Sequence, residues 1–235
     1  MIYEHFYASF GNDGESVYDS DEVAAPVAVL TEPETLEEVS EAHLDRARID
    51  SAWHVKIAAL AFEDVMTTWG KSSAELIAEG EVYTVEFKQT ARWNVREQKK
   101  DKLIEQIVQK TVAGFGNASG GTLLLGVHDD LYPVGLEADL ALVKPPNVDG
   151  YVNWLDTMLE NAFGFAFASN IKISIDQVDG RDVCRANVPR SPAPLWVEFK
   201  GQDKLFSRRN NSTRQIQADD VDGFIEQRFG RDSDD

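Results

Sequence analysis

The sequence predicts an α+β domain, because helical and strand periodicities both occur and strand patterns outnumber helical ones in the second half of the chain. Two segments, Lys99 to Phe115 and Asn147 to Phe163, repeat apolar residues every three or four positions, as amphipathic helices do. Four later segments, KISIDQV, RDVCRANV, PLWVEFK and KLFSRR, are rich in β-branched and aromatic residues and are joined by turns. With 235 residues and 43% hydrophobic content, the chain can bury a full core.

The first 73 residues are predicted to precede the main domain. Residues 1–45 contain 12 acidic residues and no lysine or arginine, which predicts an acidic, partly disordered arm. Residues 46–73 are expected to form a helical extension, since apolar residues recur at helical spacing from Ala47 to Trp69. The main domain is expected over residues 74–229, with a short acidic tail at 230–235.

Within the main domain, a short helix, SAELIAEG, is expected after the capping pair Ser72-Ser73. VYTVEFKQT follows as a strand, and TLLLGV is a second, apolar strand. GNASGG, which precedes TLLLGV, lacks the Gly-Lys-Ser/Thr ending of a phosphate-binding P-loop, so we interpret it as a structural turn. A final helix is expected from Ala218 to Phe229.

Three carboxylates and a lysine lie on or beside these two strands. Glu86 and Lys88, two residues apart, point to one face of the first strand. Glu81 is five residues before Glu86, so it reaches that face only from the turn at Gly80 or through a bulge. Mg²⁺ and Mn²⁺ prefer oxygen ligands, so the candidate metal ligands are Glu81, Glu86 and Asp129, the last of which follows TLLLGV. Lys88 is a candidate for neutralising charge at a scissile phosphate.

The formal charge of −18 argues at first against a nucleic-acid partner. The distribution of the charge changes this. From Arg46 onward the chain has 29 acids and 23 bases, so most of the negative charge lies in the first 45 residues. The bases cluster after the first strand and near the end of the domain. The alternative is that these bases occupy solvated loops and helix faces. The candidate nucleic-acid-binding residues, which would form a rim around the acids, are Arg92, Arg96, Lys99, Lys100, Arg208, Arg209 and Arg214.

The motifs GEVYTVEFK, GNASGGTLLLGVHDD, PVG and FSRRNNSTR occur in the order typical of Schlafen-type AlbA-like domains, and the chain resembles that family from about Ala74 to Phe229. The resemblance implies a mixed sheet with flanking helices and a nucleic-acid-binding role. Some Schlafen members are endoribonucleases that act on tRNA and rRNA with two glutamates and an aspartate. The matching residues are Glu81, Glu86 and Asp129. Two positions depart from the family pattern: His128 stands where an acid is common, and Asn210 replaces a glycine.

We therefore expect a nucleic-acid-processing protein, a metal-dependent endoribonuclease that acts on tRNA or other structured RNA rather than on duplex DNA. The alternative is a non-catalytic nucleic-acid-binding or regulatory module in which the acids are structural. ATP-dependent regulation is a third alternative and ranks last. A role in host defence follows from the family association alone.

The remaining expectations concern the setting of the protein. One cysteine, Cys184, excludes an intrachain disulfide, and the sequence shows no membrane-spanning run and no signal peptide. A cytoplasmic protein without a membrane partner is therefore expected. Schlafen nuclease cores contain two lobes, whereas this chain holds one motif set, which predicts a homodimer. The acidic arm is a candidate competitor for RNA, and the alternative is an arm that confers solubility or contacts another protein.

Overall fold

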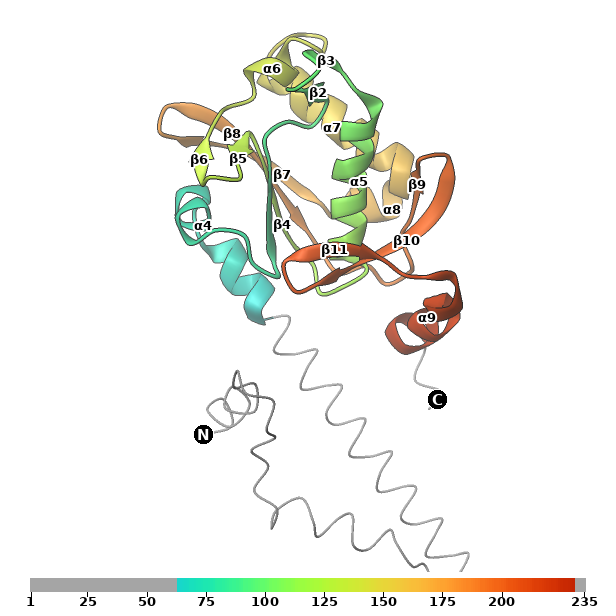
Figure 1. The fold of residues 1–235 in the computed structure, drawn as a ribbon. Helices are drawn as coiled ribbons and strands as arrows, with labels where there is room; N and C mark the ends of the chain where they lie inside the picture. The colour runs from blue at the N-terminus through green and yellow to red at the C-terminus, as the bar shows by residue number, and fades with distance from the viewer. Residues whose placement is uncertain (1–62, 231–235) are drawn as a thin grey trace, which may run out of the picture. The chain divides into compact units, whose positions relative to one another are not determined.

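A four-stranded mixed sheet forms the centre of the computed structural model, which describes residues 63–230 (Figure 1). Its strands, in spatial order, are β1 (Val85–Lys88), β4 (Gly121–Leu125), β8 (Arg181–Val188) and β7 (Lys172–Val178). β1 runs parallel to β4, whereas β8 pairs antiparallel with both β4 and β7. The predicted α+β class and mixed sheet are confirmed. The acidic arm, residues 46–62 of the helical extension and residues 231–235 lie outside the described residues.

Helices cover both faces of this sheet. On one face, Leu76 and Ile77 of α4 (Ser73–Glu79) pack with Phe87 of β1. On the other face, α5 (Lys102–Gly116) and α7 (Val148–Phe163) cover β4 and β8. Glu86 is in register with Leu123, a residue of the core under α5. Because side chains alternate along a strand, Glu86 and Lys88 lie on the α5 side of β1.

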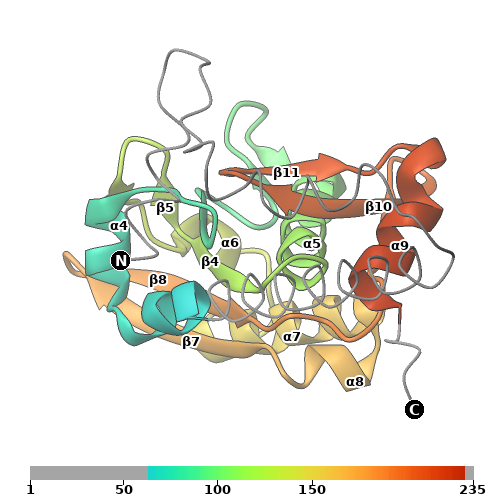
Figure 2. The same ribbon diagram turned by 90° about the horizontal axis from the view of Figure 1, so that it is seen from below.

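α5 also packs against a second sheet, so it lies between two sheets (Figure 2). The second sheet has the order β11-β10-β9, with all strands antiparallel, and consists of β9 (Trp196–Phe199), β10 (Gln202–Arg209) and β11 (Ser212–Gln215). Gly114 permits the close approach, because a Cβ atom added there would lie 2.5 Å from Thr213 Cγ2. The β10–β11 hairpin is thereby held close to the C-terminal end of α5.

Shorter elements complete the described part of the chain. Residues 63–70 are helical. One hairpin follows β1 and a second follows β4, and short helices flank α7 and close the domain. These elements are β2 (Trp93–Asn94), β3 (Lys99–Lys100), β5 (Val127–His128), β6 (Tyr132–Pro133), α6 (Glu137–Leu140), α8 (Phe165–Ala168), the 3-10 helix η1 (Ala218–Asp220) and α9 (Val221–Phe229).

Several element boundaries follow from local capping. Ser72 caps α4, accepting from the Glu75 N–H, while the Glu75 side chain accepts from the Ser72 N–H, as in a capping box. The helix predicted from Lys99 begins instead at Lys102, because Lys99 and Lys100 pair with β2 and Asp101 provides the cap. The strand predicted over VYTVEFKQT is shortened to Val85–Lys88, since residues before it form a turn.

The GNASGG segment ties the end of α5 to the second sheet. Asn117 is fully buried and its Nδ2 donates to the carbonyl oxygens of Leu195 (2.9 Å) and Phe206 (2.8 Å). The Leu195 N–H in turn donates to Asn117 Oδ1 (2.8 Å). A Cβ atom at Gly121 would lie 2.4 Å from the Phe115 ring, so only glycine fits there. These contacts support the structural interpretation of the segment.

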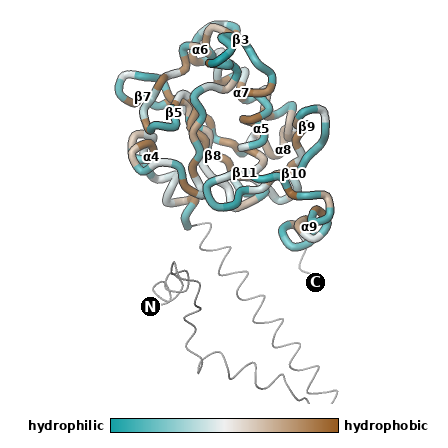
Figure 3. Tube along the Cα trace, viewed as in Figure 1, coloured by the Kyte–Doolittle hydropathy of each residue, from teal (hydrophilic) through white to brown (hydrophobic). Residues whose placement is uncertain are grey.

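Hydropathy follows the layers of the fold (Figure 3). β4 is buried over its whole length, whereas the β2–β3 and β10–β11 hairpins carry hydrophilic residues on the surface. Between residues 63 and 230, no helix has both the length and the apolar composition needed to cross a membrane.

Candidate functional site

β1 is an edge strand, and side chains complete the hydrogen bonding of its free edge. The Phe87 N–H donates to Glu81 Oε1 (2.7 Å), and Lys88 Nζ donates to Phe87 O (2.7 Å). From β10, Arg208 Nη2 donates to Val85 O (3.0 Å). These side chains take the place of a neighbouring strand, which protects the edge from pairing with another chain.

Glu81 reaches this edge because the chain reverses directly after it. Gly80 has a positive φ of 86°, which favours glycine. Val82 and Val85 then exchange two backbone hydrogen bonds of 3.1 and 3.3 Å, so the chain turns back tightly between them. The turn brings Glu81 beside Phe87. The odd spacing between Glu81 and Glu86 is thus accommodated by the tight turn between Val82 and Val85, which follows Glu81.

Glu86 is held by two cations on the α5 side of β1. Its Oε1 accepts from Lys88 Nζ, and its Oε2 accepts from Arg208 Nη1. The Glu86 side chain is 14% exposed, while that of Arg208 is fully buried. Both carboxylate oxygens of Glu86 are therefore engaged inside the domain.

Arg208 fastens β10 to the start of β1. Besides its bonds to Glu86 and Val85, the guanidinium donates to the carbonyl oxygens of Val82 (2.9 Å) and Tyr83 (3.0 Å). Its Cζ also lies 4.9 Å from the centroid of the Phe115 ring. A buried guanidinium with this many partners serves the fold, because its donors are directed at protein acceptors.

Lys110 faces the same group from α5. Burial lowers the pKa of this half-buried lysine, while the Glu86 carboxylate raises it and the Lys88 ammonium lowers it. The Lys110 Nζ lies 5.5 Å from the centroid of the Phe206 ring. The negative charge of Glu86 is therefore surrounded by cations from three elements: β1, α5 and β10.

Glu81 lies in the electrostatic field of the two other acids predicted from the sequence. Burial raises the pKa of Glu81, and the hydrogen bond from Phe87 opposes this shift. The charges of Glu86 and Asp129 raise the pKa of Glu81 further, whereas Lys88 lowers it. Asp129 is exposed after β5. The structure thus brings these four predicted site residues close to β1, with Glu86 inside the domain and Asp129 exposed.

The acids are not arranged as a metal centre. Among residues 63–230, no three His, Cys, Asp or Glu side chains are grouped so that they could hold a metal ion. Both oxygens of Glu86 accept from Lys88 and Arg208, and one oxygen of Glu81 accepts from Phe87. Asp129 and the second oxygen of Glu81 make no hydrogen bond with another residue between 63 and 230, so they are the acceptors left for a cation at this edge.

The seven candidate nucleic-acid-binding side chains divide into buried and exposed groups. Arg92 is 6% exposed, donates to Glu105 Oε1 (2.9 Å) and Leu142 O (2.9 Å), and lies 4.3 Å from the Trp154 ring. Like Arg208, it is used within the domain, so we assign both residues structural roles. The exposed members are Arg96, Lys99, Lys100, Arg209 and Arg214.

The family described as Schlafen, AlbA_2 matches residues 81–217 of this sequence. The chain belongs to this family. The match begins at Glu81 and ends two residues after β11, so it contains the whole β1 edge, both sheets and Arg208. Residues 74–80 and 218–229, which the sequence placed in the same domain, lie outside it.

Two solved structures show further similarity to the Schlafen domain. The DIP2311 protein from Corynebacterium diphtheriae is 18% identical over 74% of this chain, with a TM-score of 0.47, and the match spans 34% of its own chain. The N-terminal domain of an ATP-dependent DNA helicase RecG-related protein from Nitrosomonas europaea is 23% identical over 63% of this chain and 94% of its own, with a TM-score of 0.40. No curated protein matches the sequence.

One important carboxylate of the Schlafen domain gave no signal in the sequence. Asp139 is buried and accepts the backbone N–H groups of Ala91 (2.6 Å), Arg92 (3.1 Å) and Trp93 (3.0 Å). Burial raises its pKa, and these three hydrogen bonds lower it. Asp139 fixes the turn that leads from β1 to β2. Its partners lie 46–48 residues away in the chain, so no local pattern predicts the contact.

Proposed function

We propose that the Schlafen domain binds nucleic acid, RNA in preference to DNA, through the β2–β3 and β10–β11 hairpins. The observation that supports this is the exposure of Arg96, Lys99 and Lys100 on the first hairpin and of Arg209 and Arg214 on the second. In Figure 2 both hairpins lie on the same side of α5, and Figure 1 shows them at opposite ends of that helix. Exposed Lys and Arg side chains are the groups that contact phosphates. The preference for RNA rests on the resemblance to Schlafen endoribonucleases.

A neighbouring acid does not prevent these contacts. Lys99 Nζ lies 2.6 Å from a Glu97 oxygen, but the two side chains are 62% and 55% exposed. Ion pairs exposed to this degree contribute little to stability, so a phosphate can replace the carboxylate.

Fluorescence anisotropy with labelled tRNA and with duplex DNA, at several salt concentrations, tests the proposal. Lys100→Gln and Arg209→Gln are each expected to weaken binding and to reduce the salt slope by about 1, the value for one lost phosphate contact. Lys172→Gln is the matched control, because Lys172 is exposed on β7 at the opposite edge of the sheet. Absence of binding at low salt, or an equal loss in the control variant, would contradict the proposal.

A second candidate function is metal-dependent endoribonuclease activity. It is favoured by the raised pKa of Glu81, which lies in the field of Glu86 and Asp129, because perturbed carboxylates are common at catalytic sites. For Glu86 to bind a metal ion, its carboxylate would first have to break its hydrogen bonds with Lys88 and Arg208. Incubation of the protein with total tRNA and Mn²⁺, beside Asp129→Asn, provides the test. Cleavage that Asp129→Asn abolishes would support a nuclease, and no cleavage over a range of metals and RNAs would favour the binding module.

Homodimer formation remains part of the proposal, because a single motif set offers limited surface to a folded RNA. Light scattering at the concentrations used for RNA binding is expected to give twice the monomer mass of 26.2 kDa. A monomeric mass with undiminished RNA binding would rule the dimer out.

A further inference from the structure

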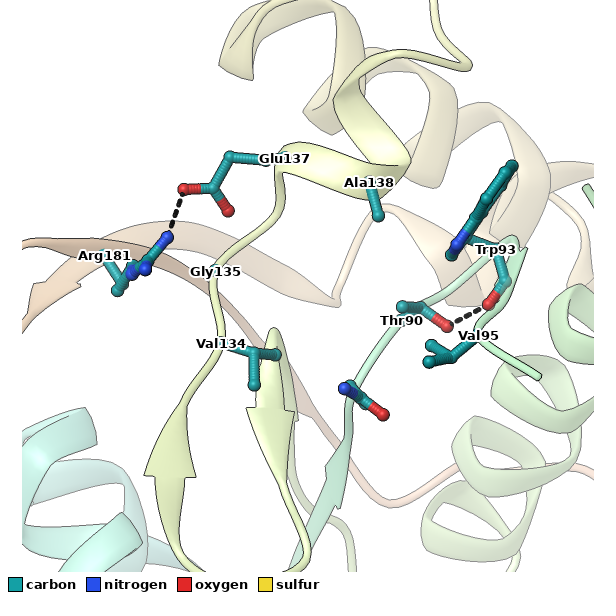
Figure 4. Close-up of a pocket in the computed structure, with 9 residues that line it drawn as sticks. Thr90, Trp93, Val95, Val134, Gly135, Glu137, Ala138 and Arg181 are labelled. Atoms are coloured by element: carbon teal, nitrogen blue, oxygen red, sulfur yellow. Dashed lines mark hydrogen bonds and ion pairs between the residues drawn. The ribbon is translucent and has the colours of Figure 1, made fainter. Parts of the chain in front are cut away.

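A pocket of about 330 Å³ opens beside the β2–β3 hairpin. Figure 4 shows Trp93 and Val95 on one side of it, and Arg181 and Glu137 on the other. Arg181 Nη1 donates to Glu137 Oε1 (3.0 Å), and the two side chains are 52% and 63% exposed. The pocket therefore has an aromatic side chain on one side and an exposed ion pair on the other.

Two hydrogen bonds hold the backbone of Trp93 in place. The Trp93 N–H donates to the buried Asp139 carboxylate, and the Thr90 hydroxyl donates to Trp93 O (2.6 Å). The indole N–H of Trp93 and the side-chain amide of Gln89, which also lines the pocket, make no hydrogen bond with any other residue between 63 and 230. An aromatic side chain on an anchored backbone and an uncommitted amide thus line the same pocket.

We propose that this pocket binds an unpaired nucleobase of a single-stranded nucleic acid. This inference rests on the proposed function and specifies its substrate class. A flat base can stack on the Trp93 indole, and the Gln89 amide can donate to and accept from a base edge. The volume is at the lower end for ligand pockets, which suits a single base.

A cation lies on the same face of the β2–β3 hairpin as Trp93. Lys100 is directly opposite Trp93 in the β2–β3 pair, so its side chain emerges on the same face of the hairpin. Lys100 is 52% exposed and its Nζ lies 3.8 Å from the nearest oxygen of Glu105, too far for a hydrogen bond. A phosphate next to a base in the pocket can therefore bind Lys100. A duplex keeps its bases stacked inside, so it cannot fill the pocket.

Anisotropy titration of the full chain with a labelled single-stranded RNA 12-mer tests this inference. Trp93→Ala is expected to weaken binding roughly 5- to 100-fold, the range for loss of one stacked base, and Trp93→Phe is expected to retain most of the affinity. A duplex of the same length should bind the unaltered protein and Trp93→Ala with the same affinity. The matched control is Trp196→Ala, since Trp196 is 42% exposed on β9 and does not line the pocket.

The possible outcomes separate this inference from the proposed function. If the unaltered protein binds no nucleic acid, both fail. If it binds and Trp93→Ala binds the single strand equally well, the pocket assignment alone is overturned. If AMP saturates the pocket at micromolar concentration, the occupant is a free nucleotide and the strand assignment is overturned. Should Trp93→Ala fail to fold by circular dichroism, Gln89→Leu, which breaks no hydrogen bond between residues 63 and 230, is expected to show the same selective loss for single strands.

Discussion

The edge of β1 and the pocket beside the β2–β3 hairpin use their polar groups in opposite ways. At the β1 edge, Glu86 and Arg208 are saturated by partners within the domain. At the pocket, Trp93 and Gln89 keep donors and an acceptor that no other described residue uses. The charged side chains at the β1 edge therefore serve the fold, and the pocket retains hydrogen-bonding groups that a ligand can use. Free hydrogen-bonding capacity on a concave surface is a more direct sign of binding than charge density is.

The largest expected effect is at Arg208. Arg208→Ala leaves the buried Glu86 with Lys88 as its remaining hydrogen-bond donor and removes donors from three backbone carbonyl groups. Breaking a buried ion pair in this way costs about 3–5 kcal/mol of unfolding free energy. Urea denaturation at neutral pH measures the loss. Arg209→Ala, one residue later but exposed, is the control and is expected to change stability by less than about 0.5 kcal/mol. Equal effects of the two variants would contradict a structural role for Arg208.

Asp139 connects the two regions, because it holds the turn between β1 and Trp93. Asp139→Asn replaces one accepting oxygen by an NH₂ group, which cannot accept from the backbone N–H groups at residues 91–93. The expected loss is about 1–3 kcal/mol of unfolding free energy, the usual result of leaving a buried donor unsatisfied. Thermal denaturation measures this loss. A variant as stable as the unaltered protein would show that the turn does not depend on the carboxylate.

A smaller effect is expected in the pH dependence of stability at Glu81. Because folding raises the pKa of this carboxyl above its usual value of 4.5, the folded state favours the protonated form, and stability falls as pH rises through the folded pKa. Glu81→Gln keeps an oxygen for the Phe87 N–H but cannot ionise. The stability of the variant relative to the unaltered protein should therefore increase from acidic to neutral pH. A relative stability that decreases over this interval would mean that Lys88 outweighs burial.

The sequence predicted those parts of the fold that depend on local patterns. The boundaries of β7 and β8 are as expected, because the two runs meet at the Asp179-Gly180 turn. The pairs β2–β3 and β5–β6 have strands of two residues, too short for any periodicity, and depend on tertiary contacts. The sequence likewise placed Glu86 and Lys88 on one face of a strand, which follows from their spacing alone.

The roles of the charged residues were harder to predict. Arg208 meets Glu86 across 122 positions of the chain, and Arg209 beside it is exposed, yet the two arginines are equivalent in the sequence. The same holds for the buried Arg92 and the exposed Arg96. Burial decides whether an arginine contacts the protein or a ligand, and burial is set by packing between distant elements. The sequence did not single out Trp93 as a binding residue, because the pocket that it lines is formed by residues from distant parts of the chain.

One NMR titration compares the two regions directly. In a ¹H–¹⁵N spectrum of the full chain, the indole N–H of Trp93, assigned with Trp93→Phe, reports on the pocket, and the backbone N–H of Phe87, which donates to Glu81, reports on the β1 edge. On addition of a single-stranded RNA 12-mer, the Trp93 signal is expected to shift progressively while the Phe87 signal stays in place. A shift of the Phe87 signal with an unchanged Trp93 signal would contradict the account and place the nucleic acid at the acidic edge.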